Sequence, residues 1–208
     1  MNLLNENNVV HIFLNKIGDI VIANLLFLLC CIPIVTIGPS FTALYHCMLR
    51  SIKGNDYGTI RTFFCALKEN FVQSLIVWLG MLAAALILIT NIIFLWSSPS
   101  AAGQLLLIAS FGVALLLFIL LLYVFPVIAA FSNTTRQLVK NAFAFAFLHI
   151  PSTLAIAAIS TLPMIMTYLD LKLLPFYACC WFFFEFGLTA YLNSLLFYRM
   201  FKPYLDKE

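Results

Sequence analysis

The chain has 208 residues, of which 64% are hydrophobic and only 9% carry a charge. Soluble domains average about 45–50% apolar and about 25% charged residues, and a soluble chain this apolar would expose patches that aggregate. The formal net charge of +3 is too small to indicate a nucleic-acid partner. Composition therefore excludes a soluble domain. It predicts an all-α, polytopic transmembrane helix bundle with the lipid bilayer as its surroundings.

The N-terminal stretch MNLLNENNVVHIF lacks a basic leader and a small-residue cleavage site, so it predicts no removable signal peptide. From Val10 onward, the apolar residues Phe13, Ile17 and Val21 recur at helical spacing, whereas Asp19 lies on another side. This pattern predicts a short amphipathic helix that lies at the membrane interface and leads into the first span.

The segment 24–45, NLLFLLCCIPIVTIGPSFTALY, couples an apolar run to a break. The break is expected from Pro33 to Pro39, because proline removes a backbone donor and Gly38 relaxes the backbone dihedral angles. Inside hydrocarbon the freed carbonyls need partners, which neighbouring helices or the hydroxyls of Thr36 and Ser40 can supply. We therefore predict that this segment packs in the middle of the helix bundle.

Charge-free runs of about twenty residues, the length that crosses about 30 Å of hydrocarbon, locate the spans. The chain has no Asp, Glu, Lys or Arg between Asn70 and Thr135, and the turn SSPSAAG divides this stretch in two. The fourth span is expected to be interrupted by Pro151 and Pro163. We predict a single membrane domain over 1–208 with about five spans, at 20–38, 71–96, 104–131, 142–168 and 173–198.

Basic residues gather in three connecting segments. The segments 50–70, 132–141 and 199–208 hold nine of the eleven Lys and Arg residues. The positive-inside rule places these segments, and with them the C-terminus, in the cytoplasm. Five spans then leave the N-terminus outside. The alternative is a re-entrant first segment, which enters the membrane, breaks from Pro33 to Pro39 and returns through 41–49, so that both termini are cytoplasmic.

Two of the cytoplasmic segments have the pattern of amphipathic surface helices. Ile60, Phe64 and Leu67 fall on one helical face of the segment 55–70. The segment 134–147 shows a weaker version of the same pattern. We predict that these helices lie on the membrane surface and lead into the second and the fourth span.

The first half of the chain also carries a more specific signal. Asn24 is followed by an apolar run, then by PIVTIGP from Pro33 to Pro39 and TALY from Thr42 to Tyr45. These residues resemble the opening signature of the YesL family of bacterial membrane proteins. The stretches DYGTIRTFFCALKENF and VKNAFAFAFLHIPSTL are similar to that family's two inner-side segments. The chain departs from the pattern at Phe27 and Phe41, where Trp and a smaller residue are expected.

The resemblance implies a multi-pass protein of the bacterial cell membrane, of unknown molecular function and often associated with sugar uptake. A sugar-uptake permease is the partner that it implies. The family has no established catalytic or ligand residue that could be carried over to this chain. What the resemblance supplies is a structural signature, made of Pro33, Thr36, Gly38, Pro39 and Tyr45.

Motifs of known enzymes and metal sites are absent from the sequence. It contains no HExxH, no GxSxG and no Gly-rich loop that could bind phosphates. Four of the six cysteines form adjacent pairs in apolar runs, which suits packing rather than spaced zinc ligands or disulfides. We therefore predict no catalytic residue, no metal site and no cofactor.

Glu185 is the acidic residue placed well inside a predicted span. A carboxylate in hydrocarbon costs roughly 2.5 kcal/mol or more, so it is expected to face the bundle interior, paired or protonated. Asn193 follows eight residues later on the same helical face, with Thr189 between them. Such a group is either a proton- or substrate-linked site or a structural hydrogen-bonding group. Candidate partners from other spans are Asn24, Asn91 and His149.

Two classes of function stay open. The first is a non-enzymatic accessory or assembly partner of a sugar-uptake permease. The second is a small stand-alone carrier with Glu185 as its intramembrane carboxylate. A carrier usually has several polar residues around a midplane cavity and broken helices in both halves. Here the best-marked break lies in the first segment alone, which favours the accessory; an intramembrane enzyme ranks third.

Overall fold

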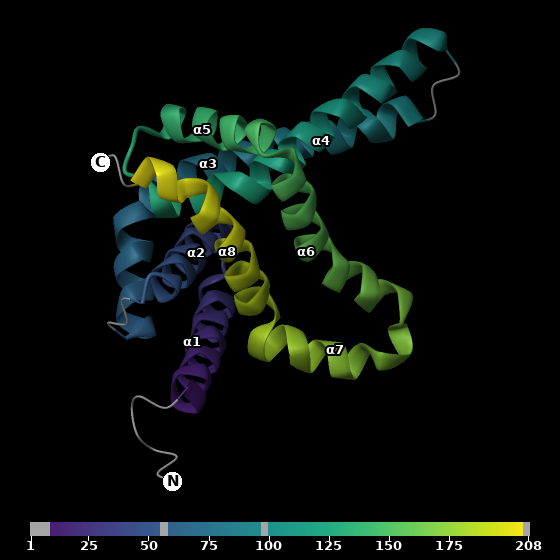
Figure 1. Ribbon diagram of the computed structural model, residues 1–208. Coiled ribbons are helices and arrows are strands. Elements are labelled where there is room, and N and C mark those ends of the chain that lie inside the picture. Colours follow the sequence, from purple (N-terminus) through teal and green to yellow (C-terminus); the bar gives the residue numbers. More distant parts are fainter. Residues whose placement is uncertain (1–8, 55–57, 97–99, 206–208) are drawn as a thin grey trace.

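The computed structural model describes residues 9–54, 58–96 and 100–205, and these residues form an all-α bundle (Figure 1). The predicted fold class is thereby confirmed. Three short turns of helix connect the longer elements: η1 (Ile34–Thr36), η2 (Leu171–Leu173) and the π-helical η3 (Trp181–Glu185). The α-helices are α1 (Val9–Cys30), α2 (Ile37–Ile52), α3 (Thr59–Trp96), α4 (Ala101–Ala130), α5 (Thr135–Leu148), α6 (Ile150–Leu169), α7 (Leu174–Cys180) and α8 (Phe186–Leu205).

Within the described residues, four helical stretches are long and apolar enough to cross a membrane. The first two are α3 and α4, which include most of the second and third predicted spans. The others are α6 and the stretch from Leu171 to Tyr204, in which α7, η3 and α8 follow one another. The chain is therefore a membrane protein by the length and composition of its helices.

The region predicted as the fourth span, 142–168, contains the end of one helix and most of another. The helix α5 ends at Leu148, and α6 begins at Ile150 with Pro151 in its first turn. A proline ring clashes with the carbonyl four residues earlier in a continuous helix, whereas in the first turn of α6 it costs no hydrogen bond, so Pro151 favours a new helix at this point. By contrast, Pro163 lies inside α6 and does not interrupt it.

The break in the first segment falls earlier than predicted. The helix α1 ends at Cys30, and α2 begins at Ile37, so Gly38 and Pro39 belong to the first turn of α2. The amides of that turn have no partner within the helix, and a proline there costs no hydrogen bond. Pro33 is therefore the residue of the signature that marks the break, and Pro39 is compatible with a helix start.

Two hydroxyls serve the carbonyls at this break, as the sequence predicts. The Thr36 Oγ1 atom donates to the carbonyl of Cys30 at 2.6 Å and to that of Pro33 at 2.8 Å. Ser40 Oγ donates to the carbonyl of Thr36 at 2.7 Å. The chain thus turns without leaving these carbonyls unpaired, which hydrocarbon would penalise.

The start of α2 packs tightly against α3. A Cβ atom added to Gly38 would lie 2.5 Å from the Cβ of Trp78 and 3.0 Å from the carbonyl oxygen of Ser74. The indole Nε1 of Trp78 donates to the carbonyl of Ile34 at 2.8 Å. One turn further along α2, the hydroxyls of Thr42 and Ser74 are 2.8 Å apart. Only a residue without a side chain allows the two helices to approach this closely.

Burial divides the broken segment into two parts. Gly38, Pro39 and most of the remaining residues of α2 are buried, as expected for a segment in the middle of the bundle. The connection itself is not: Ile32 is 77% exposed and Val35 is 48% exposed. The prediction of central packing therefore applies to α2 and is wrong for the connection.

The helices α1 and α2 form an antiparallel hairpin. Close to the connection, the rings of Phe27 and Phe41 have centroids 4.7 Å apart. At the other end, the Thr59 hydroxyl donates to the carboxylate of Asp19, and the Sγ of Cys47 lies 3.8 Å from the Thr59 carbonyl. The middle of α1, the end of α2 and the start of α3 therefore meet at the same end of the hairpin.

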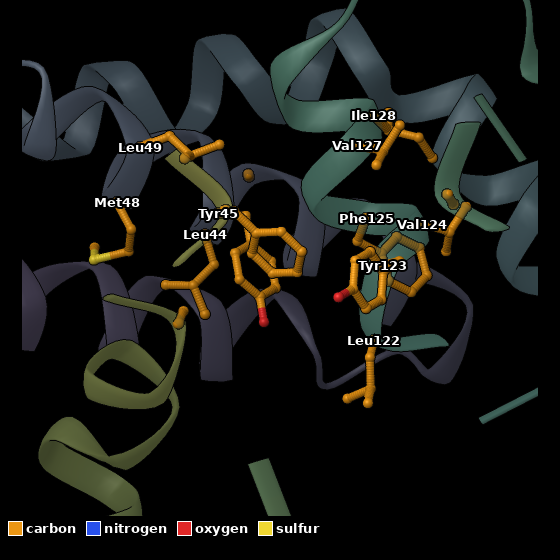
Figure 2. Packing of buried hydrophobic residues seen from close by; sticks show 14 of the residues in the cluster. Leu44, Tyr45, Met48, Leu49, Leu122, Tyr123, Val124, Phe125, Val127 and Ile128 are labelled. Carbon is orange, nitrogen blue, oxygen red and sulfur yellow. The ribbon is translucent and has the colours of Figure 1, made fainter. Parts of the chain in front are cut away.

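The core lies where α2 packs on the second half of α4 and on α8. Figure 2 shows the buried side chains of α2, among them Leu44 and Tyr45, on one side and those of α4, among them Tyr123 and Phe125, on the other. Outside this region the helices separate. Figure 1 shows the joined ends of α3 and α4 projecting away from the rest of the bundle.

Candidate functional site

Asn24 of α1 is wholly buried and joins α1 to the π-helical segment η3. Its Nδ2 donates to the carbonyls of Phe182 at 2.8 Å and Trp181 at 3.3 Å. Its Oδ1 accepts from the amide of Gly187 at 2.9 Å. All of these contacts are to backbone atoms, so they depend on the backbone conformation of this segment and not on its side chains.

The geometry of η3 explains why an amide is needed there. A π-helical turn disturbs the regular pairing of α-helical amides and carbonyls, and an amide side chain both donates and accepts. Gly187 lets α1 come close enough, because a Cβ at this position would lie 2.7 Å from the carbonyl oxygen of Ile20. The sequence indicates Asn24 as polar in an apolar run, but gives no sign of the π-helical turn that it serves.

Glu185 is the last residue of η3 and is half-buried. Its Oε1 accepts a hydrogen bond from the Thr189 hydroxyl, one helical turn further on, at 3.3 Å. The structure thus brings together Glu185 and Thr189, which the sequence places on one face. Asn24 bonds to the backbone on both sides of Glu185 and not to its carboxylate.

Asn193 of α8 is also wholly buried, but it belongs to another group of polar residues. Its Nδ2 donates to Ser160 Oγ of α6 at 2.9 Å and to the Tyr45 hydroxyl of α2 at 3.4 Å. Within the described part of the chain, Asn193 Oδ1 and Ser194 Oγ are buried without a hydrogen-bond partner. Asn193 therefore connects α8 to α2 and α6.

A cavity of about 300 Å³ lies between these groups, bounded by α2, α3, α4, α6 and α8. Its wall is largely aromatic and aliphatic, with polar atoms from Tyr45, Ser160, Thr161 and Thr189. Two of these residues bond to Asn193 and one bonds to Glu185. Glu185 and Asn193 do not line this cavity themselves, but each bonds to residues that do.

Sequence reasoning missed the contribution of α6. Ser160 and Thr161 line the cavity, and Thr167 accepts a hydrogen bond from the Trp181 indole at 3.0 Å. Hydroxyl residues are common in membrane helices and often bond to their own backbone, so their presence alone gave no usable signal. Asn91 is exposed on the projecting part of α3, and His149 lies between α5 and α6.

Among the described residues, no group of three or more His, Cys, Asp or Glu side chains could hold a metal ion. The cavity offers hydroxyl groups and aromatic rings, which can orient a small apolar or amphiphilic molecule.

Comparison with known proteins adds one match. The model of the family described as "Protein of unknown function, DUF624" matches residues 20–92, about a third of the chain. That family has no known function. The matched residues include Asn24, the broken segment and Tyr45, and they end before Ser160, Glu185 and Asn193. No curated protein and no solved structure matches the chain.

Proposed function

We propose that this chain is a membrane protein of the YesL family, without enzymatic activity, that assembles with a carbohydrate-uptake permease. The signature residues from Pro33 to Pro39 and from Thr42 to Tyr45 lie inside the matched region 20–92. The association with sugar uptake comes from the resemblance to that family. The structure contributes the reason to prefer an accessory protein over a carrier.

The observation that carries this preference is how Asn24 is used. All three of its hydrogen bonds join α1 to the backbone of η3 and α8. The Asn24 side chain therefore holds helices together and is not available to a ligand. A sugar site needs many hydrogen-bonding groups that face an open space. The cavity of about 300 Å³ has mostly aromatic and aliphatic walls, which do not suit a sugar.

The proposal of a non-enzymatic protein rests on the groups around this cavity. Glu185 has a hydroxyl, that of Thr189, as its hydrogen-bond partner. General acid–base chemistry at a carboxylate usually relies on a second ionisable group nearby. Among the described residues that line the cavity, none is His, Cys, Lys, Asp or Glu.

We also propose that both termini are cytoplasmic, with the α1–α2 hairpin as a re-entrant element. The contact between Thr59 and Asp19 returns the chain to the level at which it entered. From Asp19 to Cys30 a helix rises roughly 17 Å at 1.5 Å per residue, about half of the 30 Å of hydrocarbon. In Figure 1 the start of α1 lies at the lower left and the end of α8 at the upper left, whereas the ends of α3 and α6 lie on the right.

Cysteine labelling on intact cells tests this topology, in a background from which the six native cysteines have been removed. We expect an impermeant thiol reagent to label a cysteine at Ser98 and to leave cysteines at Asn5 and Asn133 unlabelled. Labelling at Asn5 would restore the five-span arrangement. Labelling at Asn133 but not at Ser98 would invert the whole molecule. Ser98 and Asn5 lie outside the described residues, so the results expected at these two positions rest on the proposed topology alone.

Purification and reconstitution together test the function. We expect a sugar permease subunit to co-purify with the tagged protein from its native membrane. We also expect proteoliposomes with the purified protein alone to accumulate no labelled sugar above the level of empty vesicles. Uptake by the protein alone would reject the accessory role in favour of a carrier.

The carrier is the second candidate because of Glu185. This carboxylate is half-buried, ends a π-helical turn and bonds to Thr189 on the cavity wall. Irregular turns of this kind are frequent at functional sites. In a carrier coupled to protons, Glu185→Gln would fold normally and abolish uptake, because only a carboxyl group takes up and releases a proton. In an accessory protein the same variant would support growth on the sugar as the parent does.

A further inference from the structure

A second pocket lies where α2, α4 and α8 end, away from the cavity described above. It has a volume of about 230 Å³. His46, Arg50 and Lys53 line it from the α2 side, and Tyr198 lines it from α8. Lys53 follows directly after the last residue of α2, so the pocket opens at the end of the bundle where the basic segment 50–70 begins.

The polar lining of this pocket is cationic. Arg50 and Lys53 supply two positive charges, and none of the described residues that line the pocket is acidic. His46 Nδ1 lies 3.1 Å from the carbonyl oxygen of Ala129. A carbonyl oxygen can only accept, so Nδ1 carries a proton and donates it, which fixes the imidazole ring between α2 and α4. The donor of His46 is thus used within the protein, and the match to an anion that accepts several hydrogen bonds comes from Arg50 and Lys53.

The remaining lining is apolar, from Leu49 of α2, Phe201 of α8 and the end of α4. A pocket lined by both cations and aliphatic and aromatic groups suits a molecule that is itself amphiphilic. Its volume is below the roughly 300–1,000 Å³ of pockets for drug-sized ligands, so it fits a head group better than a whole lipid.

We propose that the pocket bounded by His46, Arg50, Lys53 and Tyr198 binds the phosphate of an anionic membrane lipid. Arginine pairs with phosphate through two parallel hydrogen bonds, and lysine adds a mobile point charge. Basic pockets between transmembrane helices at the cytoplasmic side are suited to such head groups. A soluble phosphate compound has the same anionic group, but it would leave the apolar walls at Leu49 and Phe201 unused.

The cations also have a possible structural role. The last carbonyls of α2 carry partial negative charge, which a basic residue in the last turn stabilises. Arg50 lies in that turn. A purely structural role would make Arg50→Gln less stable in every lipid, whereas a lipid site changes the response to one class of lipid. The experiment therefore measures the response to lipid and not stability alone.

The test compares two double variants with the same loss of charge. Arg50→Gln/Lys53→Gln removes both cations of the pocket, and Arg136→Gln/Lys140→Gln removes an arginine and a lysine that are exposed on α5. Each purified protein is titrated in detergent with dioleoylphosphatidylglycerol, dioleoylphosphatidylcholine and soluble glycerophosphate. Bound lipid is counted by native mass spectrometry, and thermal unfolding is followed in parallel.

For the parent protein and the α5 variant, we expect phosphatidylglycerol to bind and to raise the unfolding temperature more than phosphatidylcholine does. For the pocket variant we expect phosphatidylglycerol to bind about fivefold more weakly per cation removed, or about 25-fold in all. Equal loss in both variants, or no preference for phosphatidylglycerol in the parent, would overturn the proposal. Binding of glycerophosphate without a preference for the lipid would assign the pocket to a soluble phosphate compound and would also overturn it.

Discussion

The start of α2 and the projecting ends of α3 and α4 differ in how they are packed. Around Gly38, side chains from α2 and α3 touch, and Ser40 and Thr42 are wholly buried. On the projecting ends, large apolar residues are exposed, as at Phe94, which is 81% exposed, and Leu105, which is 70% exposed.

This difference follows from the solvent. Lipid tails are as apolar as leucine, so burying a leucine against another helix gains little in a membrane. Small residues that permit close approach, and polar residues that need partners, decide instead which helices associate. The start of α2 has both kinds, whereas the projecting hairpin has mostly large aliphatic residues. Substitutions in the two regions should therefore have opposite outcomes.

The largest effect is expected for Gly38→Leu. Its side chain would enter the space held by Trp78, whose Cβ lies 2.5 Å from the position of an added Cβ. We expect a loss of about 3 kcal/mol or more in the free energy of unfolding, measured by denaturant titration in detergent, with less folded protein in the membrane. In the matched control Gly80→Leu, nothing lies within 4 Å of the added Cβ. This control should be as stable as the parent or slightly more stable, because leucine is the better helix former. Equal stability of both variants would show that α2 does not pack on α3 at this point.

An intermediate effect is expected for Asn24→Leu. The substitution leaves the carbonyls of Trp181 and Phe182 and the amide of Gly187 without their side-chain partner. Since an unpaired buried polar group costs about 1–3 kcal/mol, we expect a total loss of about 2–3 kcal/mol in the same titration. Asn91→Leu, at an exposed position of α3, serves as the control and should change stability by less than about 0.5 kcal/mol. A larger loss in the control than in Asn24→Leu would contradict the contrast between the two regions.

The smallest effect is expected for Glu185. This side chain is half-buried and has one hydrogen bond, from Thr189 at 3.3 Å. We expect Glu185→Leu to cost about 1 kcal/mol and Glu185→Gln to cost less, because an amide oxygen can still accept the bond. Thermal unfolding of both variants beside the parent gives the measurement. If Glu185→Leu were fully stable and supported growth fully, the residue would have neither a structural nor a functional role.

Composition was sufficient to predict the all-α membrane fold, because a chain with 64% hydrophobic residues has few other ways to satisfy its backbone in lipid. The roles of Thr36 and Ser40 at the break were also predictable, since hydroxyls close in sequence can reach the freed carbonyls, whereas the contribution of Trp78 from α3 was not. The position of the break was less predictable. Pro39 reads as a helix breaker in sequence, but it is harmless in the first turn of a helix, and only the structure shows where that turn lies.

The surroundings of the candidate site were harder to predict. Glu185 and Thr189 were placed together correctly because their contact follows from helical spacing alone. The partners of Asn193 come from α2 and α6, and no local pattern brings Tyr45 and Ser160 to the same point. Contacts between distant helices depend on tilt and rotation, which a single sequence does not encode in any readable pattern.

The π-helical turn η3 has a further consequence for how α8 is oriented. A π-helical turn holds one residue more than an α-helical turn, and each residue of an α-helix turns the chain by about 100°. Deleting a single residue between Trp181 and Glu185 would leave an α-helical turn, which rotates the chain by nearly the same angle, so α8 would keep its orientation to α7. The same deletion between Phe186 and Asn193, in regular helix, would rotate the residues that follow by about 100°. Asn193, which now reaches Ser160 and Tyr45, would then face a different neighbour. The extra residue in η3 can thus be lost without misaligning α8, although the irregular turn that Asn24 binds would be lost with it.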